Sequence, residues 1–397
     1  MRKISFLALA WFVQILSGFS QDSSAYKSRK LNLEEVNFVS AYYHQDGNHS
    51  AVTGGIGTEK LSDLSNTIEL KFLKADLKKR EHRLNFELGI DHYTSASSDK
   101  IDPFTLSSPS HADTRFYPSL SFSVKNAHNL TLGANISFSG EYDYRSQGLG
   151  VSLAKASEDE NKEFSLKLQA YLDSWKVIYP IELRPPGYGT GSEGQGDVIR
   201  RPRNSYSASL SYSFTVNPKL QIALLADLVT QNGLLATSYQ RVYFKDAAAH
   251  YEVLPEKRFK LPLGVRANWF FSQKILLRSF YRFYTDDWGL NAHTIELELP
   301  IKFNPFFSLA PYYRYYIQNA SKYFAPYAQH VAAEKFFTSD YDLSEFNSHF
   351  FGANLRVVPE NGVLHWLHWN SLEIRYGHYL RTNDLHADIL TLNAVFK

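Results

Sequence analysis

The densest cluster of polar and glycine residues in the chain lies between residues 45 and 59. Glycines permit positive φ angles and close backbone approach, so consecutive amides here could form an anion-binding nest. No Lys-Ser/Thr pair follows at the spacing of a nucleotide-binding loop. We favour the other interpretation, a shaped loop that plugs or braces a pore. The residues of this predicted binding or constriction loop are Asp46, Asn48, Ser50, Thr53, Gly54, Gly55, Gly57 and Glu59.

The start of this segment also imitates a calcium loop. Asp46, Asn48 and Ser50 stand at alternate positions, as do the first oxygen ligands of such a loop. Ala51 occupies the place of the turn glycine and Gly57 that of the bidentate glutamate, so the pattern is incomplete. We therefore predict no metal site and no cofactor.

Few of the 14 histidines cluster. His365 and His368 alternate with tryptophans, which is typical of an aromatic belt at a lipid interface. Ser, His and Asp are abundant, and chance neighbours such as Asp91 and His92 are expected. Because no spacing selects one set, we predict no catalytic residues and no enzyme, with a rim-located hydrolase as the least favoured alternative.

Charged residues recur at every second position of the C-terminal alternating segments. An Arg facing lipid at the bilayer midplane costs about 2–4 kcal/mol, so these side chains should face a lumen. Basic and acidic strands alternate, which allows pairing between neighbours, either as structural salt bridges or as a selectivity filter. Since Arg outnumbers Glu, a conducting lumen should prefer anions mildly. The predicted lumen-lining residues are Arg278, Arg282, Glu296, Glu298, Arg314, Asn354, Arg356, Glu373, Arg375 and Arg381.

The elements that carry these residues are predicted to be strands. Apolar and polar residues alternate from Val36 to Phe396 in segments of about ten residues, the length that a tilted membrane strand needs. Short links such as 126–129 alternate with long polar links such as 175–204 and 319–346. This alternation predicts an all-β fold, a transmembrane antiparallel up-and-down β-barrel of about 16 strands with short periplasmic turns and long extracellular loops.

Two links, residues 143–147 and 359–369, break the contrast between short and long connections. A soluble β-sandwich or propeller would also give strands of period two, but it offers no reason for link lengths to alternate.

Composition agrees with a membrane barrel. The chain has 26 Tyr, 28 Phe and 6 Trp, which suit strands and membrane interfaces. The absence of Cys excludes disulfides, Cys-ligated metal sites and a thiol nucleophile. A net charge of +2 gives no reason to expect nucleic acid as a partner.

The N-terminus has the pattern of a signal peptide. Arg2 and Lys3 precede an apolar run that ends near small residues. We expect residues 1–20 to be a signal peptide, 21–35 a periplasmic segment and 36–397 the outer-membrane barrel. The expected location is the cell outer membrane, after export directed by the signal peptide. The expected partners are outer-membrane lipids, the barrel-assembly machinery, which reads a closing strand with an aromatic residue such as Phe396, and a small-molecule solute.

Five segments spread over much of the chain carry a family resemblance. They are SAYYHQDGNHSAVTGGIGTEKLSD (Ser40 to Asp63), YTSASSDKIDP (Tyr93 to Pro103), EYDYRSQGLGVSLAK (Glu141 to Lys155), FSLKLQAYLDSWKVIYPIELR (Phe164 to Arg184) and LLADLVTQNGLLATSYQRVYF (Leu224 to Phe244). On these segments the chain resembles the domain-of-unknown-function family 3570, outer-membrane barrels found mainly in Bacteroidota. The resemblance implies a membrane-barrel fold and transfers no activity or functional residue.

Three functions are compatible with such a barrel. The first is a pore or channel for small solutes, or the outer-membrane component of a transport system. The second is a non-conducting surface or scaffold barrel that binds a partner through long extracellular loops. The third is the rim-located hydrolase. The sequence leaves the cargo and the oligomeric state open.

Overall fold

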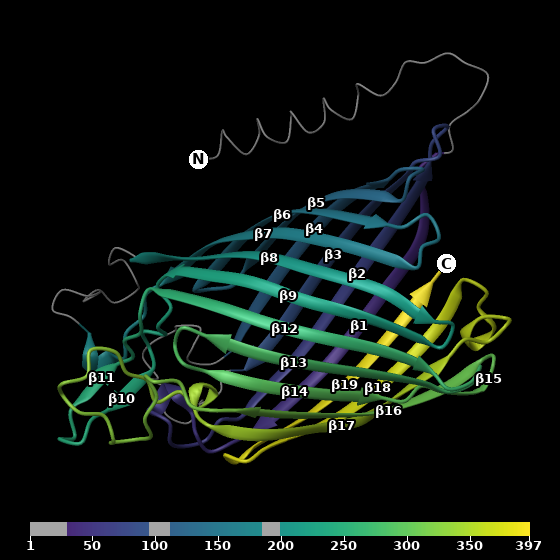
Figure 1. Cartoon of the computed structure of the whole chain (residues 1–397). Helices are drawn as coiled ribbons and strands as arrows, with labels where there is room; N and C mark the ends of the chain where they lie inside the picture. Colours follow the sequence, from purple (N-terminus) through teal and green to yellow (C-terminus); the bar gives the residue numbers. More distant parts are fainter. Residues whose placement is uncertain (1–29, 95–111, 185–198) are drawn as a thin grey trace.

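A computed structural model describes residues 30–94, 112–184 and 199–397 of the chain (Figure 1). The expected signal peptide, residues 1–20, lies outside these residues. In the described parts of the chain, no helix is both long enough and apolar enough to cross a bilayer.

The main element is a single antiparallel sheet that closes on itself (Figure 1). Its strands are β1 (Asn32–Asp46), β2 (Leu61–Ala75), β3 (Glu81–Thr94), β4 (Ala112–Lys125), β5 (Leu130–Gly140), β6 (Tyr144–Ala156), β7 (Lys162–Lys176), β8 (Arg200–Asn217), β9 (Leu220–Gly233), β12 (Lys257–Phe270), β13 (Leu276–Asp286), β14 (Asn291–Glu298), β15 (Ile301–Asn304), β16 (Phe307–Gln318), β17 (Phe346–Val357), β18 (Trp369–Arg381) and β19 (Leu385–Phe396).

Two of these segments, β14 and β15, form one interrupted strand. Both pair with β16, and Pro300 between them has no N–H to donate to a ladder. Counting them together turns the 17 segments of the sheet into 16 strands. The last strand closes on the first, from the pair Val36↔Phe396 to the pair Asp46↔His386. The predicted 16-stranded antiparallel barrel is therefore confirmed, although its first strand begins at Asn32, before the expected start at Val36.

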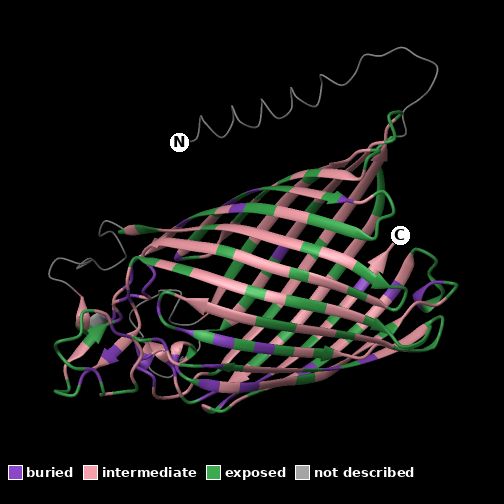
Figure 2. Ribbon diagram, in the orientation of Figure 1, coloured by how far each residue is buried: buried purple, intermediate pink, exposed green. Residues whose placement is uncertain are grey.

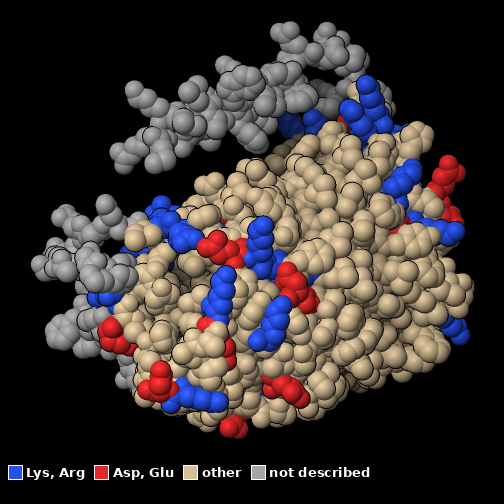
Figure 3. Space-filling model, turned by 60° about the vertical axis from the view of Figure 1, so that its left-hand side comes forward, with Lys and Arg blue, Asp and Glu red and all other residues tan. Residues whose placement is uncertain are grey.

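Each strand presents apolar residues to the outside and polar residues to the lumen. On β14, for example, Ile295 is 47% exposed and Leu297 is 42% exposed, and Glu296 and Glu298 lie on the opposite face. The burial pattern changes from residue to residue along the strands (Figure 2). Charged side chains gather at the two rims and leave a broad uncharged band between them (Figure 3). Such a wall suits hydrocarbon on its outer face and polar groups on its inner face.

Short turns join the strands at one rim, and Lys397 lies there too, donating its backbone N–H to His368 O. The opposite rim carries three long links in the described residues, between β1 and β2, between β9 and β12 and between β16 and β17. The two links that break the alternation of short and long connections in the sequence also break it in the structure. Residues 141–143 form a short link on the long-loop rim, and residues 358–368 form a long link on the other rim.

The long links have secondary structure of their own. They contain the 3₁₀ turns η1 (Ala51–Thr53) and η5 (Tyr341–Leu343) and a small sheet of β10 (Arg241–Tyr243) and β11 (Ala249–Tyr251). Further turns are η4 (Ile181–Leu183), in the link after β7, and η6 (Val363–His365), on the other rim. Val242, Phe244 and Phe337 form a buried cluster between two of the links. Because these side chains pack together, the β9–β12 and β16–β17 links form one body at the long-loop rim.

A charge placed on the outer face should destabilise the barrel much more than one placed on the inner face. Leu224 lies mid-way along the outward face of β9 and is 46% exposed. We expect Leu224→Arg to lower the free energy of unfolding by about 2–4 kcal/mol, because the guanidinium would face hydrocarbon. The matched control is Ser209→Arg on the lumen face, whose strand neighbour is Asp227. Unfolding of both variants by guanidinium chloride in lipid bilayers measures their free energies of unfolding and checks this prediction. Equal losses of stability in the two variants would contradict the assigned outer and inner faces.

Candidate functional site

The first long link, residues 47–60, is a tightly hydrogen-bonded loop, called loop one below. The Ser50 carbonyl accepts from Thr53 N at 3.2 Å and from Gly55 N at 2.9 Å, and Glu59 N donates to Gly47 O at 2.8 Å. Gly54, Gly55 and Gly57 have φ angles of +83°, +83° and +85°, a region that favours glycine. The predicted glycines therefore fold the loop back on itself.

Loop one lies against the other two long links. Arg241 Nη1 donates to Val52 O at 3.0 Å, and the His49 ring stacks on Tyr341 with ring centroids 3.8 Å apart. A Cβ atom on Gly54 would stand 2.7 Å from the Tyr243 ring, and one on Gly55 would stand 2.7 Å from Ser339 O. These close approaches show that loop one packs on the other two long links.

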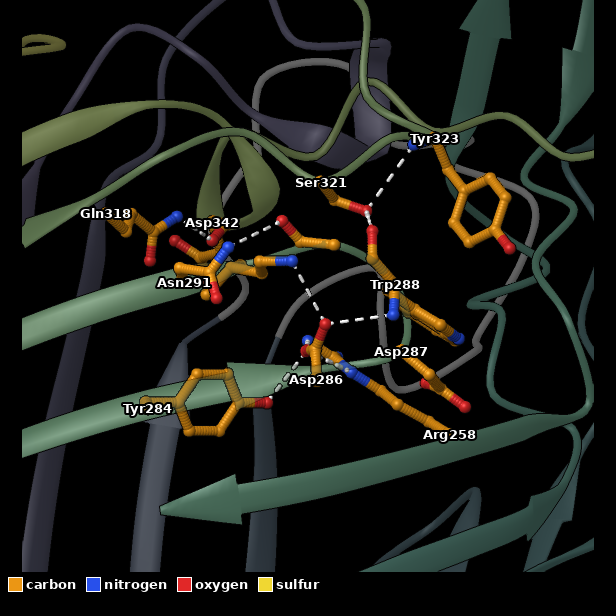
Figure 4. A network of polar contacts seen from close by, with 12 residues as sticks. Arg258, Tyr284, Asp286, Asp287, Trp288, Asn291, Gln318, Ser321, Tyr323 and Asp342 are labelled. Carbon is orange, nitrogen blue, oxygen red and sulfur yellow. Dashed lines mark hydrogen bonds and ion pairs between the residues drawn. The ribbon is translucent and has the colours of Figure 1, made fainter. Parts of the chain in front are cut away.

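The link between β16 and β17 is held by a polar network around Asp286 (Figure 4). The Asp286 carboxylate accepts from Arg258 Nε at 2.9 Å, from Tyr284 Oη at 2.8 Å and from two backbone amides of its own turn. Ser321 Oγ donates to Trp288 O at 3.1 Å, and Lys322 Nζ donates to Asp287 O at 2.7 Å. The buried ion pair between Arg258 on β12 and Asp286 at the end of β13 thus holds the β13–β14 turn, and carbonyls of this turn fix the start of this third loop.

The three links leave a cavity of about 460 Å³ against the wall formed by the ends of β3, β6, β7 and β8. Its lining brings together residues from loop one, the β5–β6 link and the two other long links. They are Ser50, Ala51, Val52, Glu59, Leu61, Tyr93, Thr94, Glu141, Asp143, Tyr144, Trp175, Arg203, Tyr239, Gln240, Asp340 and Asp342. Five of these side chains carry carboxyl groups and one carries a guanidinium.

Burial raises the pKa of four of these carboxyls. The pKa of Glu59 rises to about 7, through burial and then through the charge of Asp342. The pKa of Asp340 rises to about 6 for the same two reasons, and burial also raises the pKa values of Glu141 and Asp143. Behind them, burial raises the pKa of Glu252 to about 8. The cavity therefore concentrates acidic groups that lack full compensation by cations.

Two acceptors in this region have no hydrogen-bond partner in the described structure. Ser50 is only 1% exposed, and its Oγ atom is unpaired. The Oε2 atom of Glu59 is likewise buried and unpaired. Glu59 Oε2 lies against Gly47, where an added Cβ would stand 3.1 Å from it. Buried polar atoms are normally hydrogen-bonded, so the Ser50 hydroxyl, which lines the cavity, indicates a place where another molecule could bind.

The other predicted loop residues lie in different surroundings. Asp46 pairs with Lys60 at 3.2 Å, Asn48 is exposed, and Thr53 is buried and donates to Ser50 O. Among the residues that the structure describes, no three His, Asp or Glu side chains lie close enough to hold a metal ion.

The predicted lumen residues form pairs along the inner wall. Arg278 Nη1 lies 3.2 Å from Glu298 Oε2, and Arg356 Nε lies 2.9 Å from Glu373 Oε1. Asn354 also donates to Glu373, at 3.2 Å. These neighbours neutralise one another, as structural salt bridges would.

The remaining arginines of the predicted set also have close neighbours. Arg314 lies over the Phe350 ring at 4.9 Å, Arg375 lies over the Tyr312 ring at 3.9 Å, and Arg381 Nη1 lies 2.5 Å from Asp342 Oδ1. The strand register places Glu296 opposite Arg314 and Arg282 opposite Thr294. Arg381 is thus the member that connects the barrel wall to the cavity.

Sequence reasoning missed most of the cavity. Its carboxyls come from links that are far apart in the chain, and of the cavity residues only Ser50 and Glu59 were among those predicted. One signal was present: the motif acid-Tyr-acid occurs at Glu141-Tyr142-Asp143 and again at Asp340-Tyr341-Asp342. The side chains of Asp91 and His92 point to opposite faces of the barrel wall and do not form a pair. Asp91 accepts a hydrogen bond from Ser65, whereas His92 contacts Thr114 on the other face.

Fold and inner wall together define a 16-stranded barrel of the outer-membrane type. The family model described as "Protein of unknown function (DUF3570)" matches residues 93–363, and the chain belongs to this family. No curated protein matches the sequence.

Several solved structures are similar to the fold. A BenF-like porin from Pseudomonas fluorescens Pf-5 has 9% identity and a TM-score of 0.43, with 91% of this chain and 98% of that chain covered. OccK9 (OpdG) from Pseudomonas aeruginosa has 10% identity and a TM-score of 0.43, with 91% and 97% covered. OccAB1 from Acinetobacter baumannii has 9% identity and a TM-score of 0.42, with 93% and 99% covered.

Removing the Asp286 carboxylate should release the third loop. We expect Asp286→Ala to destabilise the loop by about 3–5 kcal/mol, because Arg258 would keep a buried, unpaired charge. Hydrogen exchange of residues 319–345 should become much faster. Asp287→Ala is the matched control, since the Asp287 side chain is exposed and only its carbonyl contacts the loop. Equal exchange in the two variants would show that the network does not hold the loop.

Docking of loop one should weaken as pH rises. Because the pKa of Glu59 is raised from 4.5 to about 7, its contribution to docking is full below 4.5 and is lost as pH rises through about 7. The groups that face Glu59 are Asp340 and Asp342 from the third loop, Arg381 from β18 and Tyr43 from β1.

The protection factors of residues 47–60, which correct each exchange rate for its intrinsic dependence on pH, should therefore be larger under acidic than under neutral conditions when no solute is added. Glu59→Gln imitates the protonated side chain and should remove most of this difference in protection. Smaller protection factors in acid, or an undiminished difference in the variant, would refute the assignment.

Proposed function

We propose that this protein is an outer-membrane channel for small solutes whose mouth is narrowed by loop one and its two partner loops. The observation that carries the proposal is the closed 16-stranded barrel with a polar inner wall. Barrels of this size leave an aqueous channel unless loops or side chains fill it. Here the long links leave a polar cavity between themselves and the ends of β3, β6, β7 and β8.

The proposal includes the route by which the chain reaches the membrane. Residues 1–20 would direct export, and residues 21–35 would precede the barrel on the periplasmic side, apart from the strand residues from Asn32 onward. The outward apolar band would then contact outer-membrane lipids after insertion by the barrel-assembly machinery. This orientation places the long-loop rim, and the cavity, on the cell exterior.

The predicted loop residues have a role in this channel as a constriction. Loop one is fixed by Arg241 and by the stacking of His49 on Tyr341, so it would stay across the mouth. The predicted lumen residues would line the path behind it, with most charges paired. No catalytic role is proposed for any of these residues.

Conductance of the purified full chain in planar bilayers tests the proposal. We expect steady ohmic openings, and we expect deletion of residues 50–58 to raise the conductance because the constriction is removed. A double variant, His49→Ala with Arg241→Ala, keeps the loop length but removes its two anchors, and should give larger and noisier openings. Silent bilayers with correctly folded protein would favour the alternative, a scaffold barrel that binds a partner through its loops.

A further inference from the structure

The balance of charge in the cavity is strongly acidic. Five carboxyl groups line it, and the one guanidinium, that of Arg203, lies over the Trp175 ring at 4.8 Å. Asp342 is partly neutralised by Arg381 at 2.5 Å, but Glu59 and Asp340 have no ion-pair partner among the described residues. A cationic solute would compensate these charges.

The unpaired Ser50 hydroxyl indicates what kind of cation fits. Ser50 lines the cavity, is 1% exposed, and its Oγ atom has no hydrogen-bond partner among the described residues. An ammonium group could donate to this oxygen, because it offers three N–H donors and no acceptor. A quaternary ammonium ion has no N–H bond and would leave the oxygen unpaired.

Aromatic rings form much of the remaining lining, from Tyr93, Tyr144, Trp175 and Tyr239. Tyr144 meets Trp175 edge to face, with centroids 5.6 Å apart. Such surfaces bury methylene groups and attract cations to their ring faces. They fit an alkyl chain that carries the charge.

The carboxyls form two groups. Glu141 and Asp143 belong to the β5–β6 link and influence each other, whereas Glu59, Asp340 and Asp342 belong to the long links and influence one another. Tyr239 lines the same cavity and is influenced by charges of both groups. Two acidic groups in one cavity match a chain with an ammonium group at each end.

We propose that the cavity at the barrel mouth binds a small aliphatic diamine, with one ammonium group at Glu59, Asp340 and Ser50 and the other at Glu141 and Asp143. The inference deepens the proposed function, because such a cation would be the solute that the channel admits. It adds the class of solute, which the barrel geometry by itself leaves open.

Calorimetric titration of the full chain in detergent tests the site without requiring conduction. The probes are 1,5-diaminopentane and its neutral analogue 1,5-pentanediol, at about pH 8, where ordinary carboxyls are ionised. We expect saturable binding of the diamine and none of the diol. This contrast uses the unaltered protein, so it does not depend on whether a variant folds.

Variants locate the site. Glu59→Gln with Asp340→Asn should weaken diamine binding at least about tenfold, because the variant loses the charge-assisted hydrogen bonds of both carboxylates. Glu360→Gln, an exposed carboxyl on the opposite rim, is the matched control and should bind as the unaltered protein does. Equal binding of diol and diamine, or full affinity in the double variant, would overturn the proposal.

The outcomes separate this inference from the channel itself. Ohmic openings without diamine binding would leave the channel in place and refute the diamine site. Binding with silent bilayers would leave the diamine site in place and refute the channel.

Discussion

The structure depends on one constraint: every backbone N–H and C=O within the hydrocarbon region needs a partner inside the protein. An open sheet would expose unpaired groups at its edges, each costing several kcal/mol in lipid. The pairing of β1 with β19, from Val36↔Phe396 to Asp46↔His386, removes both edges. Closure then fixes an inside and an outside for every strand, and the alternation of side chains follows from it.

Closure also explains where the structure can be irregular. Within the barrel wall the ladders allow little variation, as the continuous register of β2 with β3 illustrates. At the long-loop rim, backbone groups can instead form hydrogen bonds with other loops and with side chains. The short strands β10 and β11, the turn η5 and the folded loop one lie at this rim. Arg241, Tyr341 and Asp286 connect these parts through side-chain contacts. The acidic cavity is what remains between this loop body and the wall.

The strands were predictable from the sequence because alternation is a local property: Leu84, Phe86, Leu88 and Ile90 mark an outward face without knowledge of their neighbours. The start of β1 was misplaced because its first residues, Asn32 to Glu35, are mainly polar and are held by pairing with β2 across a bulge.

Contacts between strands were predictable where register follows from short turns, and the pair Arg278 and Glu298 is one example. The cavity was not predictable, since Glu59, Glu141 and Asp340 meet only through loop packing over long sequence separations. The expected anion preference considered the wall of the C-terminal half alone and omitted these loop carboxyls.

The central claim is that the loops make an acidic mouth that governs what enters the lumen. The most direct measurement is the reversal potential of single channels of the full chain in a potassium chloride gradient at neutral pH. An acidic mouth concentrates cations at the entrance, so the potential should have the sign of a cation-selective pore and move toward zero when the bath is acidified. A reversal potential of anion-selective sign, unchanged by acid, would contradict the claim.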